Sequence, residues 1–166
     1  MRTRRCPADG ATVFPVLMRA QRVIRAGGWP GDNAADSVTL DYDRRHRRRL
    51  ALTTDGGRNL LLDLAEATHL RDGDGLDCGD EGIVRVIAAP ESLIGIAAPP
   101  ALLIRIAWHL GNRHLDVAFQ PGDECGSLLI RDDHVIGDMV RRLGATVTPV
   151  TAPFDPESGA YDGHHH

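Results

Sequence analysis

The chain has 166 residues and a formal net charge of -4, with 42% hydrophobic and only 4% aromatic residues. This length suffices for one domain or two small ones with an aliphatic core, and the acidic balance argues against a dedicated nucleic-acid binder. The three cysteines, Cys6, Cys78 and Cys125, lie too far apart for a disulfide framework or a CxxC zinc site.

No segment reaches the roughly 20 apolar residues that cross a bilayer. The arginines near the N-terminus are not followed by the apolar core of a signal peptide. We therefore expect a cytoplasmic protein that contacts no membrane.

The first half of the chain alternates short strand patterns with frequent turns. Residues 1–15 show no periodicity and are expected to form an N-terminal arm. Strands are predicted over residues 16–24, 37–40, 50–54, 59–62 and 83–89. This pattern predicts a β-rich N-terminal domain over residues 16–90, a small sandwich or barrel.

The pattern changes at Pro90, where two helices appear among the strands. Strands are predicted over 93–96, 114–119, 127–130 and 145–150, and helices over 101–110 and 133–143. The order strand, helix, strand, strand, helix, strand is that of the ferredoxin-like fold. The whole chain is thus expected to be α+β, with a ferredoxin-like domain over 91–151 and a flexible C-terminal tail over 152–166.

The local signals in the second half give details that a structure can check. Pro99-Pro100 suits the start of the first helix, and Gly111 is expected to end it in a left-handed conformation. Asp132 or Asp133 can cap the second helix. In the strand over 114–119, alternation places Leu115, Val117 and Phe119 on one face.

The candidate metal ligands are histidines. His114 follows the turn that ends the first helix, where one imidazole nitrogen could bind a metal while the other is held by a hydrogen bond. One histidine cannot hold a metal ion tightly, but a two-fold dimer axis would bring a second copy. Spacing alone favours an ordinary surface histidine at 114, and at His109 one that interacts with the carbonyl end of the helix.

Two further groups of histidines remain open. His134 follows Asp132 and Asp133, which suit N-capping, although carboxylate plus imidazole would also suit several divalent metals. The terminal His164, His165 and His166 are either a native metal-binding tail or the remnant of an expression tag.

The strongest charge feature is the run from Arg44 to Arg49, which contains five arginines and His46. It could bind RNA or an acidic partner, but solvated arginines that protect a strand edge explain it more simply. The chain contains no P-loop, GxGxxG, GxSxG or HExxH motif and no nucleophile with a recognisable base. We therefore expect no catalytic residues and no enzymatic activity.

The residues around these histidines resemble those of the urease accessory nickel chaperones, the UreE family. The resemblance extends from about residue 16 to the end and is carried by Leu110 to His114, Asp133 to Ile136 with Met139, Leu143 to Val147, and Pro153 to Tyr161. Looser matches in the N-terminal half are Asp55 to Arg58, Leu70 to Asp74, and Val86 to Ala89. The chain departs from some relatives in having Asp132 where they have a histidine, and in its short tail.

The resemblance implies a homodimeric nickel metallochaperone in which His114 of both chains shares one Ni²⁺. His134 and the tail histidines 164–166 would add ligands, and Zn²⁺ or Cu²⁺ could bind as well. It also implies delivery to the urease apoprotein through the family's GTPase, UreG. Two alternatives stay open: a general copper or zinc buffer, and a module that binds RNA or an acidic partner through Arg44–Arg49.

Overall fold

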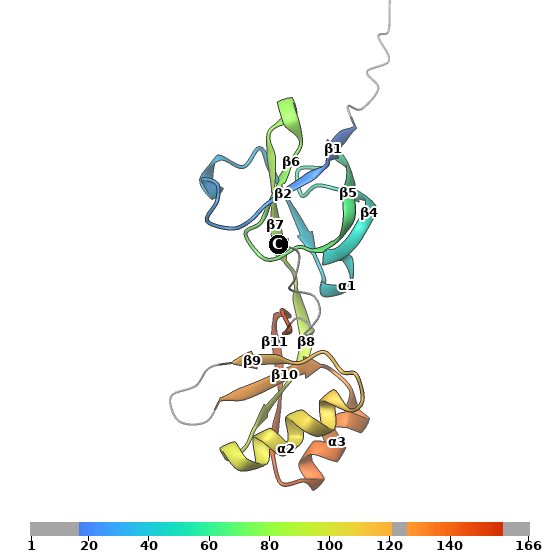
Figure 1. Ribbon diagram of the computed structural model, residues 1–166. Helices are drawn as coiled ribbons and strands as arrows, with labels where there is room; N and C mark the ends of the chain where they lie inside the picture. The colour runs from blue at the N-terminus through green and yellow to red at the C-terminus, as the bar shows by residue number, and fades with distance from the viewer. Residues whose placement is uncertain (1–16, 121–125, 158–166) are drawn as a thin grey trace, which may run out of the picture.

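The structure is a computed structural model that describes residues 17–120 and 126–157. It has two domains, one above the other in Figure 1, joined by the long strand β8 (Pro90–Ala97). Only Ala89 separates β8 from β7 (Ile83–Ala88), the last strand of the N-terminal domain. No described helix is long and apolar enough to cross a membrane.

The N-terminal domain is β-rich, as the sequence predicted. Its other strands are β1 (Met18–Ala20), β2 (Arg22–Ile24), β3 (Asp36–Leu40), β4 (His46–Thr53), β5 (Asn59–His69) and β6 (Gly75–Asp77). Short helices are η1 (Gly31–Asn33), α1 (Tyr42–Arg45) and η2 (Gly79–Glu81). The strands form two sheets, β1-β5-β4 and β2-β6-β7-β3, around one aliphatic core.

Two features of this domain differ from the prediction. The expected strand over 16–24 is divided at Gln21, because β1 pairs with β5 in one sheet while β2 pairs with β6 in the other. The arginine run does not lie wholly on an edge: it begins in α1 and continues into β4, and Arg45 at the end of α1 is fully buried.

The C-terminal domain has the predicted ferredoxin-like order β8-α2-β9-β10-α3-β11. The remaining elements are α2 (Pro100–Gly111), β9 (Ala118–Gln120), β10 (Ser127–Arg131), α3 (His134–Arg142) and β11 (Thr146–Pro153). The strand order is β11-β8-β10-β9, and every pairing is antiparallel. Both helices pack on one face of this sheet (Figure 1), where Ile96, Ile106 and Leu128 are fully buried.

The opposite face of the sheet has its own small core. Leu93, Ala118, Leu129 and Phe154 are buried there together. Ala118 therefore faces this core while Phe119 is 56% exposed. The predicted alternation over 114–119 is confirmed, since Leu115 and Val117 pack against the helix-side core and Phe119 lies opposite Leu128 of that core. The predicted start of the strand was wrong, because regular pairing begins only at Ala118 and the preceding residues form an irregular link.

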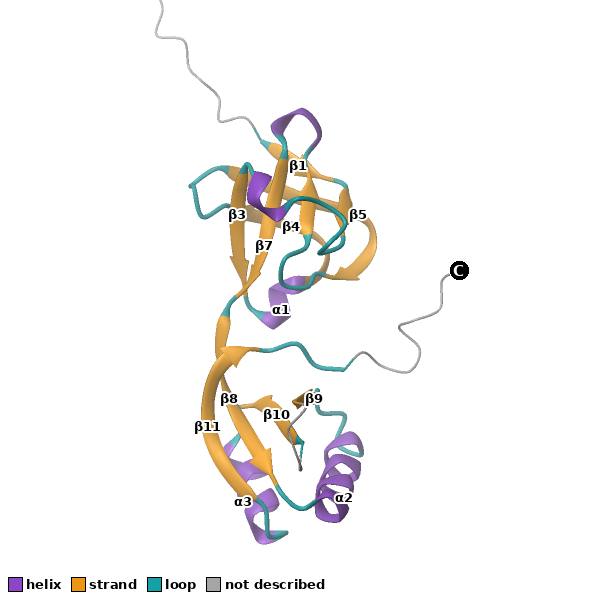
Figure 2. Cartoon of the chain, turned by 90° about the vertical axis from the view of Figure 1, so that its left-hand side faces the viewer, coloured by secondary structure: helices purple, strands orange, loops and turns teal. Residues whose placement is uncertain are grey.

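The chain after β11 runs back across the sheet toward β9 (Figure 2). We predicted that the last strand would end at residue 150 and the tail begin at 152. Instead β11 continues to Pro153, Phe154 is fully buried, and the backbone N–H of Glu157 donates to the carbonyl of Val117 at 2.9 Å. The described chain is thus packed as far as Glu157.

The two domains meet around the guanidinium of Arg45. It donates to the carbonyl of Leu70 at 3.2 Å, in its own domain, and to the carbonyl of Phe154, in the other. Asp155 lies 3.6 Å away, and its side chain is half exposed. Tyr42 packs edge-on against Phe154, with ring centroids 5.3 Å apart. One buried cation therefore ties the segment after β11 to the N-terminal domain.

Candidate metal centre

His114 lies in the turn that ends α2, and its backbone is left-handed, with a φ of 55°. The N–H of Leu115 donates to the carbonyl of Leu110 at 3.3 Å, and the N–H of His114 donates to that of Gly111 at 2.9 Å. This is the bonding pattern of a Schellman motif, in which the left-handed position is usually glycine. Leu110 and Leu115 contribute to the same core, as the motif requires.

The glycine prediction for this turn was therefore wrong by three residues. Gly111 is the last residue of α2, and the capping residue Asn112 is right-handed. Among the described residues, His114 is the only non-glycine residue with a positive φ. A left-handed conformation costs an ordinary residue about 1–2 kcal/mol, and such strain tends to persist where function requires the side chain.

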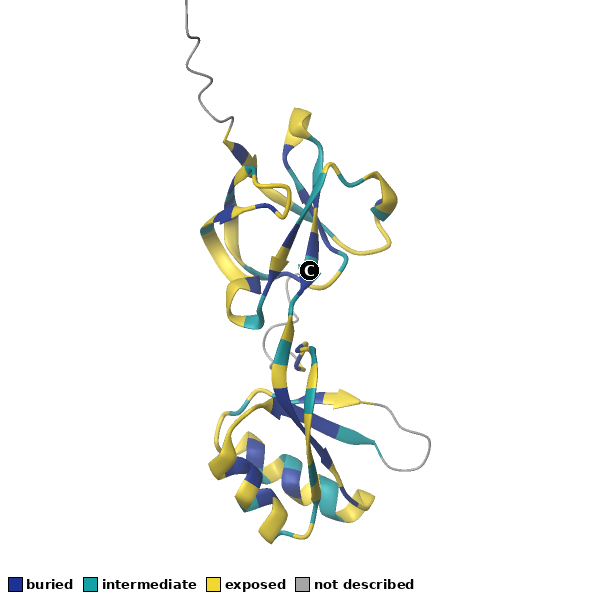
Figure 3. Ribbon diagram, turned by 180° about the vertical axis from the view of Figure 1, so that it is seen from behind, coloured by how far each residue is buried: buried dark blue, intermediate teal, exposed yellow. Residues whose placement is uncertain are grey.

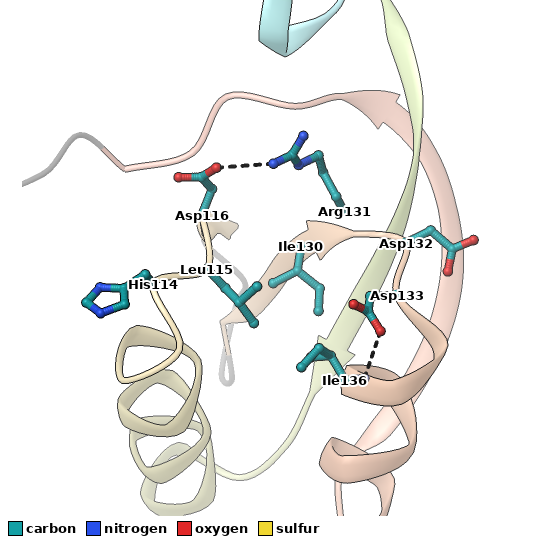
Figure 4. Close-up of a pocket in the computed structure, with 8 residues that line it drawn as sticks. All are labelled: His114, Leu115, Asp116, Ile130, Arg131, Asp132, Asp133 and Ile136. Atoms are coloured by element: carbon teal, nitrogen blue, oxygen red, sulfur yellow. Dashed lines mark hydrogen bonds and ion pairs between the residues drawn. The ribbon is translucent and has the colours of Figure 1, made fainter.

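His114 lines a hollow of about 370 Å³, together with residues from the start of α3 and the end of β10. Figure 4 shows its imidazole pointing away from the other lining side chains. Asp132 points outward on the opposite side of the hollow, and Asp116 pairs with Arg131 at 3.6 Å. None of the other side chains drawn points a nitrogen or oxygen atom toward the imidazole of His114.

His134, the other predicted ligand that the structure describes, lines a different hollow from His114. His134 is the exposed first residue of α3 and lines a separate hollow of about 380 Å³ with Arg113 and Met139. The N-cap prediction is confirmed for Asp133, whose carboxylate accepts hydrogen bonds from the N–H groups of Val135 and Ile136 at 2.8 and 3.1 Å. His164, His165 and His166 lie outside the described residues.

His109 is half-buried in the last turn of α2. Its ring packs edge-on against that of Trp108, with centroids 5.0 Å apart. The guanidinium of Arg113 donates to the backbone carbonyl of His109 at 2.9 Å. Arg113 therefore supplies a cationic donor at the carbonyl end of the helix.

A third group of histidines lies between the domains, and sequence reasoning missed it. The ring centroids of His46 and His69 are 6.0 Å apart, and Nε2 of His69 is 3.6 Å from Asp155. Burial lowers the pKa of His69; Asp155 raises it, but Arg45 lowers it further. Because the Arg45 guanidinium lies 3.5 Å from the same Nε2, a cation already occupies the side that a metal would need.

No group of three or more histidine, cysteine or carboxylate side chains gathers around a possible metal position in the part of the chain that the structure describes. The described part of one chain therefore supplies at most one further side chain of these kinds to a metal at His114. A tight site at this position would need ligands from elsewhere.

An apolar face beside His114 is the second feature that the sequence analysis missed. Ile104 and Trp108 on α2 are 71% and 64% exposed, and Phe119 on β9 is 56% exposed. Ile104, Ala107, Trp108 and Gly111 fall within an arc of about 100° on the helix, since each residue turns about 100°. The signal was present in the sequence, because α2 carries more apolar residues than its one buried face uses.

Comparison with known proteins decides the family. The model for the UreE urease accessory protein N-terminal domain matches residues 16–89, and the model for its C-terminal domain matches residues 87–166. The chain belongs to the UreE family. Membership implies an accessory role in urease maturation.

Curated relatives agree with this assignment. A urease accessory protein UreE of Bradyrhizobium sp. strain BTAi1 is 53% identical over 146 residues, which are 87% of this chain and 68% of the relative. That of Beijerinckia indica is 45% identical over 148 residues, 89% of this chain and 83% of the relative. That of Chelativorans sp. strain BNC1 is 46% identical over 136 residues, 81% of this chain and 84% of the relative.

Proposed function

We propose that this UreE chain is a nickel-binding metallochaperone that carries Ni²⁺ for assembly of the urease active site. The observation that carries the proposal is His114: an exposed imidazole held in a left-handed conformation that glycine would adopt with less strain. Neutral imidazole is a good ligand for Ni²⁺. A position that keeps histidine at a structural cost is the position expected of a ligand.

The site is completed by a second copy of the chain. Exposed apolar patches mark protein–protein contacts, and Ile104, Trp108 and Phe119 form such a surface close to His114. A two-fold axis through this surface would place the two His114 side chains near each other, because an isologous interface pairs identical residues. The homodimer is thus part of the metal site.

His134 and the terminal His164, His165 and His166 are proposed as accessory ligands. A few imidazoles shared between chains would hold an ion firmly enough to collect it and loosely enough to release it. The same ligands accept Zn²⁺ and Cu²⁺, and Cu²⁺ binds such donors more tightly than Ni²⁺. Preference for nickel would therefore depend on metal supply and on the receiving partner.

The proposed partners are the accessory GTPase UreG and the urease apoprotein, in the cytoplasm. The cargo is transferred and not chemically changed, so no catalytic residues are proposed. Support comes from family membership and from the resemblance in the segments around His114 and residues 153–161.

The test combines nickel titration calorimetry with measurement of molar mass in solution. His114→Ala is expected to remain a dimer and to lose the tight nickel site, whereas Trp108→Glu is expected to become monomeric and lose that site as well. Val135→Glu changes an equally exposed apolar residue on α3, 61% exposed, and serves as the control that stays dimeric.

Other outcomes would count against parts of the proposal. Nickel binding by His114→Ala with the affinity and stoichiometry of the wild type would refute the shared site. A wild-type monomer at micromolar concentration with nickel present would refute the dimer. A chain that ends at Gly163 and binds nickel unchanged would remove the tail from the ligand set. Delivery of zinc or copper, but not nickel, to apo-urease assembly would favour a general metal buffer.

A further inference from the structure

A cluster of arginines lies at one edge of the N-terminal domain, distant in sequence from His114. Arg44, Arg47, Arg48 and Arg49 are all exposed, on α1 and the first half of β4. Arg19 on β1 is also exposed and pairs with Asp63 on β5, the strand between β1 and β4. We call the four residues on α1 and β4, namely Arg44, Arg47, Arg48 and Arg49, the arginine edge.

The arginine edge has four cations, whereas α1 and β4 together contain one carboxylate, that of Asp43, which pairs with Arg131. Asp63 is shared by Arg19 and Arg49, whose Nε lies 3.8 Å from it. Arg44, Arg47 and Arg48 have no ion-pair partner among residues 17–120 and 126–157. The chain has a net charge of -4, but the charge of this edge is positive. A positive surface favours contact with a negatively charged molecule.

The backbone of the arginine edge is also open to a partner. β4 is the terminal strand of the order β1-β5-β4, and of the described strands only β5 pairs with it. Figure 3 shows the outer strand of this sheet largely in the exposed colour. Pairing with β5 is regular from Arg49 to Thr53 and shifts between Arg47 and Arg49. A terminal strand presents unpaired N–H and C=O groups that an extended peptide can bind.

A second copy of the chain and an RNA fit this edge less well. Two β4 strands would bring their arginines together, and like charges at an edge oppose self-pairing. Unstructured RNA is usually held by aromatic side chains that stack on bases, but Trp29 is buried in the described structure and Tyr42 packs against His69 and Phe154. Unpaired backbone groups suit a peptide strand better than a phosphate chain.

We propose that the arginine edge is a docking site for an extended acidic segment of another protein, which adds as a strand along β4 and pairs its carboxylates with the arginines. This site is separate from the metal centre and does not depend on nickel. It gives the N-terminal domain a role of its own, the recognition of a partner.

The probe is a short fluorescein-labelled peptide of alternating glutamate and threonine, with fluorescence anisotropy measured at low salt in the presence of a chelator. The test variant is Arg47→Gln/Arg48→Gln, and the matched control is Arg85→Gln, an exposed arginine on β7 in the other sheet. We expect the double variant to bind roughly tenfold more weakly, since each exposed ion pair contributes about fivefold or less. The control should bind like the wild type.

Two further probes test the chemistry of the partner. The same peptide with proline in place of each threonine keeps every carboxylate but loses donors for strand pairing, so it should bind more weakly than the threonine peptide. A single-stranded oligouridylate of the same length should bind more weakly than the acidic peptide.

Each result supports or overturns the proposal. Equal binding of the acidic peptide by the wild type and the double variant would overturn it, as would equal loss in Arg85→Gln. Undiminished binding of the proline peptide would overturn strand addition, and tighter binding of the oligouridylate would assign the edge to RNA. Because a chelator is present throughout, these failures cannot be confused with failure of the nickel site. Circular dichroism and thermal unfolding confirm that the variants are folded.

Discussion

His114→Gly tests two properties of the proposed metal ligand separately: the backbone strain at residue 114 and the binding of nickel. In the metal-free protein this change removes a side chain from a left-handed position with a φ of 55°. Both hydrogen bonds of the turn use backbone groups of residues 110, 111, 114 and 115, so glycine keeps them. We therefore expect a variant that is more stable than the wild type and has lost the tight nickel site.

The magnitude follows from two opposing effects. Relief of the left-handed conformation contributes about 1–2 kcal/mol. The greater freedom of glycine in the unfolded chain offsets this by about 0.5–1 kcal/mol. The net gain in the free energy of unfolding is about 0.5–1 kcal/mol, which would raise the melting temperature by about 1–4 °C in a chain of this size.

The assay is thermal or urea unfolding in a chelator, followed by nickel titration of the same preparations. His114→Ala is the matched comparison, because alanine also lacks the ligand but keeps a Cβ at the strained position. It should lose nickel and gain no stability. A His114→Gly protein that is less stable than the wild type without metal would refute the reasoning, since the imidazole would then contribute a structural contact worth more than the strain.

Three further predictions concern the fold. Arg45→Met removes the donors to two buried carbonyls and should lower the free energy of unfolding by about 2–3 kcal/mol in denaturant titrations. Charged hydrogen bonds contribute about 1.5–3 kcal/mol each, while loss of a buried cation recovers part of its desolvation cost. The control is Arg44→Met at the exposed neighbouring residue, which should change the free energy of unfolding little. For Asp36, partial burial raises the pKa, but hydrogen bonds from the Thr54 side chain and from neighbouring donors outweigh it and lower the pKa from 3.8 to about 2. The carboxylate thus stabilises the fold above 3.8 and loses that effect as pH falls toward 2, so Asp36→Asn should show a smaller drop in melting temperature between about pH 5 and pH 2. Asp133→Ala removes the N-cap of α3 and should cost about 1 kcal/mol in urea unfolding.

Clear results would contradict each of these. Equal stability of Arg45→Met and Arg44→Met would show that the buried guanidinium does not join the domains. An Asp36→Asn protein with the same acid sensitivity as the wild type would place the critical carboxylate elsewhere. Asp132→Ala is the control for the cap: if it destabilises α3 as much as Asp133→Ala, the hydrogen bonds from Val135 and Ile136 do not account for the loss.

Local signals predicted much of the C-terminal domain. Pro99-Pro100 before α2 and Asp133 before α3 act through contacts with adjacent residues, so the sequence contains the whole cause. The left-handed residue after α2 was misplaced because Gly111 satisfies the local preference, whereas the packing of Leu115 against the core extends the turn to His114. Local preference and core packing disagreed there, and packing prevailed.

Long-range contacts explain what the sequence could not provide. The parallel pairing of β1 with β5 and of β3 with β7 has no local signature. Arg45 resembles its exposed neighbours in the arginine run, but its guanidinium is buried against the carbonyls of Leu70 and of Phe154, the latter more than a hundred residues away. The proposed ligand His114 likewise belongs to no group of three or more metal-binding side chains in the described part of its own chain, so the proposed site depends on a contact that one sequence does not reveal.

The bond between Glu157 and Val117 fixes the origin of a tether. It joins Glu157 to Val117, which lies three residues after His114 in the chain. His164 lies seven residues beyond Glu157, and seven residues span at most about 25 Å. A short tether raises the local concentration of its ligand where it is attached. The accessory ligands proposed at His164, His165 and His166 are therefore within chain reach of His114, which lines the same hollow as Val117 and Glu157.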